Sequence, residues 1–295
     1  MAKGKLGSEM KRRMVQVISA LLTNPHIPGF IKGGIYQGSM KMVCVPGMNC
    51  YSCPAATAAC PIGAMQAVIG SRKFSFSFYV MGTICLLGVL LGRFICGWLC
   101  LFGLVQDLLY KIPVPKLTVP QKADKILRYA KYVFLVVFVL GLPAFLNNEF
   151  GISMPYFCKL VCPVGMLEGG IPLTILNESL RETIGFLFGW KFLILAVILV
   201  SSMVIYRPFC KYICPLGALY SLFNKVSFLE IHVDSENCTS CGLCRKACVM
   251  GVDVTKNPDS AECIRCGKCV SACPRNVLHM GMTIPKQKAP AKDAK

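Results

Sequence analysis

The sequence has few charged residues, few acidic residues and almost no histidine. Asp, Glu, Lys and Arg make up 16% of the 295 residues, whereas a typical soluble domain has about 25%. Hydrophobic residues make up 55% and the mean hydropathy is +0.57, which excludes a water-soluble globule. The same composition excludes a disordered chain, collagen and a coiled coil. The three histidines, His26, His232 and His279, give no pattern for binding haem.

The charge that is present is mostly basic. The 32 Lys and Arg residues exceed the 14 Asp and Glu residues and give a formal net charge of +18. Such an excess can indicate nucleic-acid binding, but here it stands in blocks beside apolar segments, where it more often orients membrane helices. We therefore expect contact with membrane lipid and no nucleic-acid partner.

Four apolar segments could span a bilayer, which needs about 20 residues of helix. The best of them has no charge over 19 residues, and the first is interrupted by Pro25 and Pro28. The four predicted spans are 14–31, 74–92, 132–148 and 192–206. The sequence therefore predicts an α-helical membrane protein with about four transmembrane helices.

The distribution of Lys and Arg sets the expected orientation. Five precede the first span and seven lie between the second and third, whereas the other two connections carry four and three. The positive-inside rule then predicts a multi-pass protein of a prokaryotic inner membrane with both termini in the cytoplasm. The basic start resembles a signal peptide, but no small-residue cleavage site follows cleanly, so we expect it to be retained.

The hydropathy falls after Phe223, which predicts three parts. Residues 1–228 form the membrane domain, and residues 229–284 form a small α+β domain of the bacterial two-cluster ferredoxin type. Residues 285–295 are rich in Lys, Ala and Pro and lack the apolar residues that a packed core needs, so a disordered tail is predicted.

Two cysteine runs define the C-terminal domain. Each has the spacing C-x2-C-x2-C-x3-C of bacterial ferredoxins, in which the fourth cysteine of each run binds the other cluster. The crossing arises because three closely spaced thiolates cover three corners of a cube and the fourth must come from elsewhere. The two predicted [4Fe–4S] clusters are bound by Cys238, Cys241, Cys244 and Cys273, and by Cys263, Cys266, Cys269 and Cys248. Structural zinc is the alternative, but zinc sites favour two separated C-x2-C pairs.

Four more motifs occur in the membrane domain, each a cysteine followed closely by an apolar residue and a glycine. They begin at Cys60, Cys100, Cys162 and Cys214, and the last three have a second cysteine four residues earlier, at Cys96, Cys158 and Cys210. The first and third motifs are expected outside and the second and fourth inside, which makes a parallel repeat. The repeat brings the inner motifs together, and one further cluster is predicted on Cys96, Cys100, Cys210 and Cys214.

The outer side has more cysteines than one cluster needs. They are Cys44, Cys50, Cys53, Cys60, Cys158 and Cys162. Ala56 stands where the repeat expects a cysteine, so Cys50 or Cys53 would complete a set with Cys60, Cys158 and Cys162. Alternatively Cys44, Cys50, Cys53 and Cys60 bind a cluster alone, or Cys44 and Cys50 form a disulfide on an oxidising face. One or two membrane clusters are therefore expected in total, with Cys44 a candidate iron ligand.

Polar residues beside the motifs have two interpretations. Gln66, Gln106 and Asp107 are candidate quinone contacts, although solvation of helix ends is the simpler reading. Arg93 and Arg207, each three residues before an inner cysteine pair, either raise the potential of the inner cluster or anchor helix ends at the cytoplasmic face.

These motifs together resemble the NapH/NosR-like membrane ferredoxins, which have C-x3-C-P motifs around four helices and a two-cluster ferredoxin domain. The resemblance covers nearly the whole chain. Leu101 departs from the expected proline, the 44–54 stretch is unusually rich in cysteine, and there is no FMN-binding domain of the NosR kind. The resemblance implies an electron-transfer subunit of a quinol-dehydrogenase kind rather than a stand-alone enzyme, with menaquinone as a candidate partner.

The leading hypothesis is a membrane electron carrier. It relays electrons between a cytosolic donor or quinol and an extracytoplasmic redox partner, with partner proteins on both faces. The alternative is an assembly, metal-reducing or redox-sensing accessory factor, for which Met40, Met42, Met48 and Cys44 offer soft metal ligands.

Overall fold

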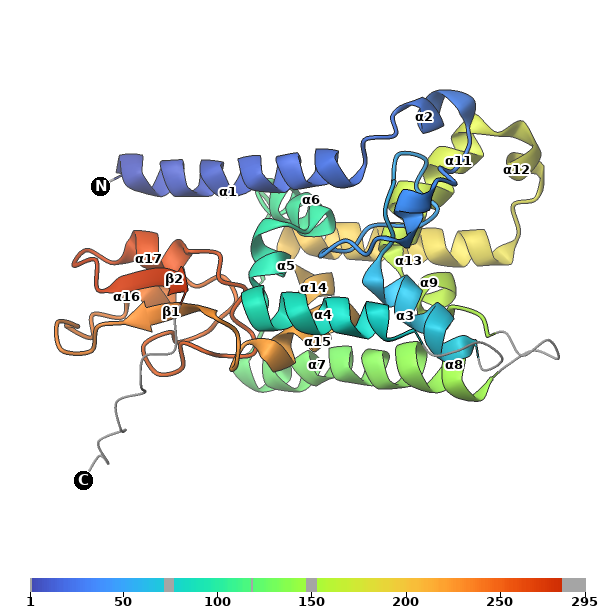
Figure 1. Ribbon diagram of the computed structural model, residues 1–295. Helices are drawn as coiled ribbons and strands as arrows, with labels where there is room; N and C mark the ends of the chain where they lie inside the picture. The colour runs from blue at the N-terminus through green and yellow to red at the C-terminus, as the bar shows by residue number, and fades with distance from the viewer. Residues whose placement is uncertain (1, 72–76, 118, 147–152, 283–295) are drawn as a thin grey trace.

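The computed structural model describes residues 2–71, 77–117, 119–146 and 153–282. Long helices lie side by side along the molecule, and a small C-terminal domain packs against one end of them (Figure 1). The predicted tail at 285–295 lies outside the described residues, as do parts of two predicted spans, at 74–76 and 147–148.

Four long helical segments make the body of the membrane part. They are α1 (Ala2–Thr23), α4 (Phe78–Leu91), α7 (Gln121–Phe134) continued by the π-helical turn η2 (Leu135–Gly141) and α8 (Leu142–Phe145), and α13 (Phe186–Val204). Their directions alternate along the chain, because α1 and α7 lead away from the C-terminal domain and α4 and α13 lead towards it (Figure 1).

Two helices of the described chain are long and apolar enough to cross a membrane, Gln121–Phe145 and Phe186–Val204. Only 22% and 17% of their apolar windows are buried, so wide apolar faces of both helices are exposed. Phe186 is 88% exposed and Val197 and Val200 about 60%. The other two predicted spans stay predictions. The described part of α4 has only 14 residues, and α1 ends just before Asn24 and Pro25.

Short helices carry the membrane cysteines, and each motif has the same local structure. The cysteine at the start of the motif is the N-cap of a helix, in extended conformation, before a helix-starting residue that is proline in three cases. These helices are α3 (Pro61–Gly70), α6 (Leu101–Leu109), α10 (Pro163–Gly165) and α15 (Pro215–Phe223). The helices before the last three are α5 (Phe94–Trp98), α9 (Tyr156–Leu160) and α14 (Pro208–Tyr212), whose third residues are Cys96, Cys158 and Cys210.

The remaining short elements lie away from the C-terminal domain (Figure 1). They are α2 (Pro28–Lys32), the 3-10 helix η1 (Ser39–Met42), the π-helical turn η3 (Met166–Gly170), α11 (Ile171–Leu176) and α12 (Glu178–Glu182). The segment between η1 and α3 makes one parallel bridge, Cys44 to Ala59, which closes it into a loop.

The C-terminal domain is built on one antiparallel strand pair. The strands β1 (Leu229–Val233) and β2 (Leu278–Met282) pair with His232 opposite His279. Each cysteine run ends in a short helix, α16 (Leu243–Ala247) or α17 (Lys268–Ala272). Gly242 and Gly267 precede these helices with φ of 71° and 77°, a left-handed conformation that glycine adopts without strain.

Candidate metal centres

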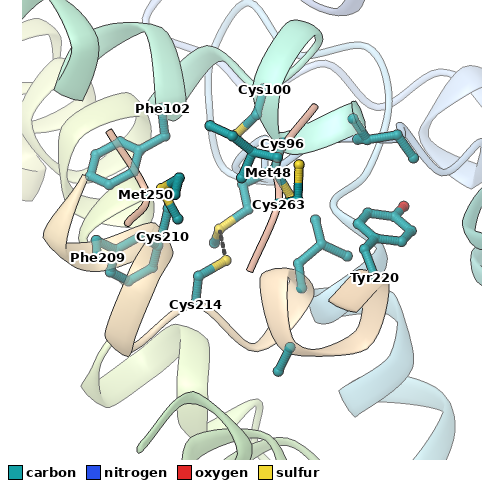
Figure 2. Packing of buried hydrophobic residues seen from close by; sticks show 14 of the residues in the cluster. Met48, Cys96, Cys100, Phe102, Phe209, Cys210, Cys214, Tyr220, Met250 and Cys263 are labelled. Carbon is teal, nitrogen blue, oxygen red and sulfur yellow. Dashed lines mark hydrogen bonds between the residues drawn. The ribbon is translucent and has the colours of Figure 1, made fainter. Parts of the chain in front are cut away.

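The inner set, Cys96, Cys100, Cys210 and Cys214, lies in the buried core close to the C-terminal domain. All four side chains are buried, and Figure 2 shows them converging from α5, α14 and the starts of α6 and α15. Burial, and then the charge of Cys100, raises the pKa of Cys210 to about 12. Four buried thiolates repel one another, so they need a compensating cation. This donor set fits an anionic cysteine-ligated [4Fe–4S] cluster.

At the inner set, each half of the repeat contributes an arginine that contacts a cysteine of the other half. The Nη1 of Arg207 donates to the Cys96 carbonyl oxygen at 2.6 Å, and the Nη2 of Arg93 donates to the Cys210 carbonyl oxygen at 3.3 Å. Both arginines are fully buried, so neither anchors a helix end in water. They instead hold the cysteine of the opposite motif and place positive charge beside the four thiols.

Asp107 balances part of that charge. Its carboxylate accepts from the Nε and Nη2 of Arg207 at 2.7 and 2.6 Å, and it lies 2.9 Å from Arg12 of α1. Burial opposes ionisation, but Arg207 and Arg12 together lower the pKa of Asp107. Both carboxylate oxygens are used within the protein, and the quinone contact of Asp107 stays a prediction.

Gln66 and Gln106 join motifs from opposite halves of the repeat. The Nε2 of Gln106 donates to Cys210 Sγ at 3.0 Å while its Oε1 accepts from the Phe209 N–H at 3.2 Å. The Nε2 of Gln66 donates to Cys158 Sγ at 3.3 Å while its Oε1 accepts from the Phe157 N–H at 2.9 Å. Both side chains are buried, so the solvated helix end predicted for them is wrong, whereas the quinone contact stays a prediction.

The two glutamine contacts join the first cysteine motif to the third and the second to the fourth. Each glutamine stands six residues after a motif cysteine, Cys60 or Cys100. The sequence signal for these contacts is a glutamine at the same distance from the motif cysteine in both halves of the repeat.

The outer set lies at a cavity of about 550 Å³ farther from the C-terminal domain. Of the predicted cysteines, the cavity is lined by Cys44, Cys50, Cys60, Cys158 and Cys162. Cys53 is packed instead with Ala55 and Ala56. Burial, and then the charge of Cys60, raises the pKa of Cys158 to about 12, so here too several thiolates would need a cation.

A carboxyl group and a lysine complete this cavity. The Glu168 carboxylate accepts from the Cys50 backbone N–H at 2.7 Å, which ties the cysteine-rich loop to η3. Burial raises the pKa of Glu168 to about 7. The Lys191 ammonium also lines the cavity, next to Gly165. Lys41 lines the cavity as well, so two lysines lie at the outer set.

The structure groups the cysteines of the C-terminal domain across the two runs. Cys238, Cys241, Cys244 and Cys273 line one cavity of about 250 Å³. Burial and then the charges of Cys266, Cys263 and Cys248 raise the pKa of Cys269 to about 12, which places Cys248 with the second run. These are the two crossed groups that two [4Fe–4S] clusters require.

No three His, Cys, Asp or Glu side chains of the described chain approach closely enough to hold a single metal ion. In the inner set the four thiols come from two cysteine pairs, whereas each ferredoxin group has three thiols from one run and one from the other. A [4Fe–4S] cluster needs four thiols that are farther apart than the ligands of a single metal ion, because each thiolate binds a different corner of the cube.

The second cysteine run sits directly on the inner set. A Cβ added to Gly97, between Cys96 and Cys100, would lie 2.3 Å from the Ile264 carbonyl oxygen. Arg93 and Lys131 both pair with Glu262. Asn224 Nδ2 donates to the Cys263 carbonyl oxygen at 2.8 Å. The group containing Cys263 is therefore the one nearer the membrane part, and the group at Cys238 is the more distant.

Comparison with known proteins also indicates 4Fe-4S binding. The 4Fe-4S binding domain family matches residues 58–79, 75–120 and 186–231, in both halves of the repeat, and a second family of that description matches residues 257–279. An uncharacterized protein of Methanocaldococcus jannaschii is 30% identical over 184 residues, which are 60% of this chain and 66% of that protein. No solved structure matches the chain significantly.

The named relatives include a putative electron transport protein and ferredoxin-type proteins. The putative electron transport protein YccM of Escherichia coli is 30% identical over 58% of this chain and 45% of its own length. The ferredoxin-type protein NapH of Haemophilus influenzae is 25% identical over 80% of this chain and 73% of its own. Proteins named NosR and MauN also match. The chain spans two thirds or less of the length of the Methanocaldococcus jannaschii protein and of YccM. These matches support the resemblance of the chain to the NapH/NosR-like 4Fe-4S ferredoxin family.

Proposed function

We propose that this iron–sulfur electron-transfer protein relays electrons across a membrane through four cluster sites in series. The main support for this order is the close contact between Gly97 and Ile264, which places the second ferredoxin run against the inner set. The order of sites is then the Cys238 group, the Cys263 group, the inner set and the outer set. A [4Fe–4S] cluster at each site supplies one-electron transfer.

The proposed ligands are the cysteines that lie together in each of the four sites. The ferredoxin groups are crossed, with Cys273 in the first and Cys248 in the second. The inner set contributes four cysteines. Cys50, Cys60, Cys158 and Cys162 are the outer ligands that the cavity supports, because they line it and Cys53, packed behind Cys50, does not. Cys44 remains close to this set without being needed as a fourth ligand.

The proposed topology has four spans and both termini in the cytoplasm. It is supported by the alternating directions of α1, α4, α7–α8 and α13 (Figure 1) and by the Lys and Arg distribution. The ferredoxin domain then faces a cytosolic donor, and the outer set faces an extracytoplasmic partner. A reporter fused to the C-terminus should be active only in the cytoplasm, and activity outside would reverse this orientation.

The outer cavity supports menaquinol as a second source of electrons. Its wall next to the cysteines includes Ala64, Ala67, Val80 and Pro155, an apolar surface that suits a quinone ring. Quinol should reduce the outer set in the purified protein. A Val80→Arg variant, which fills this wall with charge, should lose that reduction and keep reduction by a cytosolic donor.

The experiment that tests the cluster content is anaerobic iron and sulfide analysis with electron paramagnetic resonance (EPR) titration. Four clusters require about 16 iron atoms per chain. About 8 iron atoms, with signals of the ferredoxin domain only, would refute the membrane sites.

A metal-reducing accessory role is the second candidate. It is favoured by Met42, Met48 and Cys44, which all line the outer cavity and offer soft ligands. Copper(I) bound stoichiometrically by the iron-loaded protein, and lost in Met42→Leu, would support this role over transfer to a protein partner.

A further inference from the structure

A cavity of about 530 Å³ lies where the C-terminal domain meets the membrane part, and we call it the junction cavity. One wall comes from the start of α7, the residues that follow α13, and α14. The other wall comes from residues between 245 and 256 of the C-terminal domain. Because α7 leads away from that domain and α13 leads towards it, the two helices have these ends at the same side of the molecule (Figure 1).

Basic side chains predominate in the junction cavity. Five cationic side chains line it, whereas the lining carboxylates are only Asp124 and Asp253. The five are Lys125, Arg128, Lys211, Arg245 and Lys256. Asp124 is already saturated, because Arg128, Lys211 and the Tyr212 hydroxyl donate to it at 2.5, 2.6 and 2.6 Å. The other three cations share the single remaining carboxylate, so the cavity favours an anion.

The cations that remain are available to a ligand. Lys125 is exposed and makes no ion pair or hydrogen bond with any residue that the structure describes. Arg245 is 61% exposed and lies 3.9 Å from Asp253, the distance of a weak pair. The helix α7 adds to the positive field, because Gln121 at its first turn lines the cavity and no side chain caps this helix end. Unpaired positive charge therefore gathers at one place from both parts of the molecule.

The junction cavity has the depth of the lipid headgroups in the proposed topology. Ile205 and Tyr206, at the end of the apolar segment 192–206, line it. Arg128 precedes the apolar segment 132–148 by four residues, which is about 6 Å along a helix. The headgroup layer on each side of the hydrocarbon core is about 5–7 Å thick. The cations of the cavity therefore lie at the level of lipid phosphates.

An apolar strip leads from this level along α7. Tyr129, Val133 and Val136 follow one another at intervals of four and three residues, which places them on one side of the helix. They are exposed by 70%, 58% and 58%. The acyl chains of a lipid fit this strip while its phosphate group lies in the cavity. A free phosphate or a nucleotide would leave the strip uncovered, so the surface favours a lipid.

We propose that the junction cavity binds the phosphate group of an anionic phospholipid whose acyl chains lie along α7. Basic pockets between membrane helices on the cytoplasmic side bind such headgroups. The proposal rests on the membrane placement in the proposed function, and on neither its clusters nor its direction of electron flow. Lys125 belongs to the membrane part and Lys256 to the C-terminal domain. The bound lipid therefore helps to hold the domain against the membrane part.

Two double variants with the same change of charge separate this site from the general attraction of a basic protein for anionic lipid. Lys125→Gln/Lys256→Gln, the cavity variant, removes one cavity cation from each part of the molecule. Lys122→Gln/Lys246→Gln is the matched control, because these lysines lie in α7 and α16 and neither lines the cavity. All four side chains are exposed, so both double variants should fold.

The measurement is native mass spectrometry of the full-length, iron-loaded protein in detergent. The probes are dioctanoyl phosphatidylglycerol, dioctanoyl phosphatidylcholine and inorganic phosphate. Wild-type protein should bind one phosphatidylglycerol per chain, more tightly than either other probe. The cavity variant should bind it about 25-fold less tightly, because each basic residue beside an anionic lipid contributes about fivefold. The control should bind it like the wild-type protein.

Equal phosphatidylglycerol binding by the two double variants would overturn the proposal and leave the cations to the anionic group at Cys248. Inorganic phosphate bound as tightly as phosphatidylglycerol would assign the cavity to a free anion and overturn the lipid. So would slower reduction of the cavity variant by an acidic donor protein with unchanged lipid binding, which would indicate a protein partner. Iron analysis of the same samples keeps the two proposals apart. Missing membrane clusters with lipid bound at the cavity would refute the electron relay alone.

The opposite result, about 16 iron atoms with equal lipid binding in both variants, would refute the lipid site alone.

Discussion

Replacing Gly97 by alanine should separate the ferredoxin domain from the inner set. Gly97 lies in α5 between the ligands Cys96 and Cys100. Its own carbonyl oxygen accepts from Arg12 and Gln16 of α1, at 3.3 and 3.1 Å. The residue is therefore held from one side by α1 and faces the second cysteine run on the other.

The magnitude follows from one distance. The new Cβ would lie 2.3 Å from the Ile264 carbonyl oxygen, so the two backbones must separate by roughly 1 Å to reach ordinary contact. Overpacking of this kind costs about 1–3 kcal/mol. Set against docking of the domain, that energy corresponds to a 5- to 150-fold shift away from the docked state. The pairs that Glu262 makes with Arg93 and Lys131 would keep part of the interface.

The assay is reduction of the inner site by electrons placed on the ferredoxin domain, followed by rapid-freeze EPR. Gly97→Ala should keep about 16 iron atoms and slow this step, and protease should cleave the segment joining the domains more readily. Gly82→Ala in α4 is the matched control, because an added Cβ there has nothing within 4 Å. Equal transfer rates in the two variants would refute the docking argument.

The remaining predictions concern the ligands and their neighbours. Cys100→Ser and Cys214→Ser should each remove the same inner cluster, and the double variant should lose no more iron than either single variant, since the first change already destroys the site; additive loss in iron analysis would contradict a shared site. Cys248→Ala should damage the cluster at Cys263, Cys266 and Cys269, and EPR loss at Cys238, Cys241 and Cys244 alone would contradict the crossing. Gln106→Leu leaves the Phe209 N–H unsatisfied, so thermal unfolding should report a loss of about 1–3 kcal/mol, and redox titration should show a lower inner potential. An unchanged potential would mean that the amide contact with Cys210 does not tune the site.

Much of the cysteine arrangement could be predicted because it depends on spacing. The N-cap geometry of Cys60, Cys100, Cys162 and Cys214 follows from a cysteine placed just before a helix start. Pairing of distant motifs follows from the repeat, which the contacts of Gln66 and Gln106 reproduce in both halves. The helix-end solvation expected for the two glutamines is wrong, because both side chains are buried against the opposite motif.

Other features depend on packing that no local pattern encodes. The position of Met48 against Cys214 results from the way the 44–60 loop enters the core, 166 residues away in sequence. The separate burial of Cys53 with Ala55 and Ala56 has the same origin. Helix length was a further limit. Hydropathy gave four apolar segments, but only 121–145 and 186–204 form described helices long and apolar enough to span a membrane.

The most direct test of electron transfer across the membrane uses proteoliposomes with the ferredoxin domain outward. A reductant that cannot cross the lipid is added outside, and an oxidised acceptor that cannot cross is trapped inside. The trapped acceptor should be reduced by the wild-type protein and not by Cys100→Ser, which lacks an inner ligand but keeps the eight ferredoxin cysteines. Reduction of an acceptor added outside, with none of the trapped acceptor reduced by the iron-replete wild-type protein, would contradict the account.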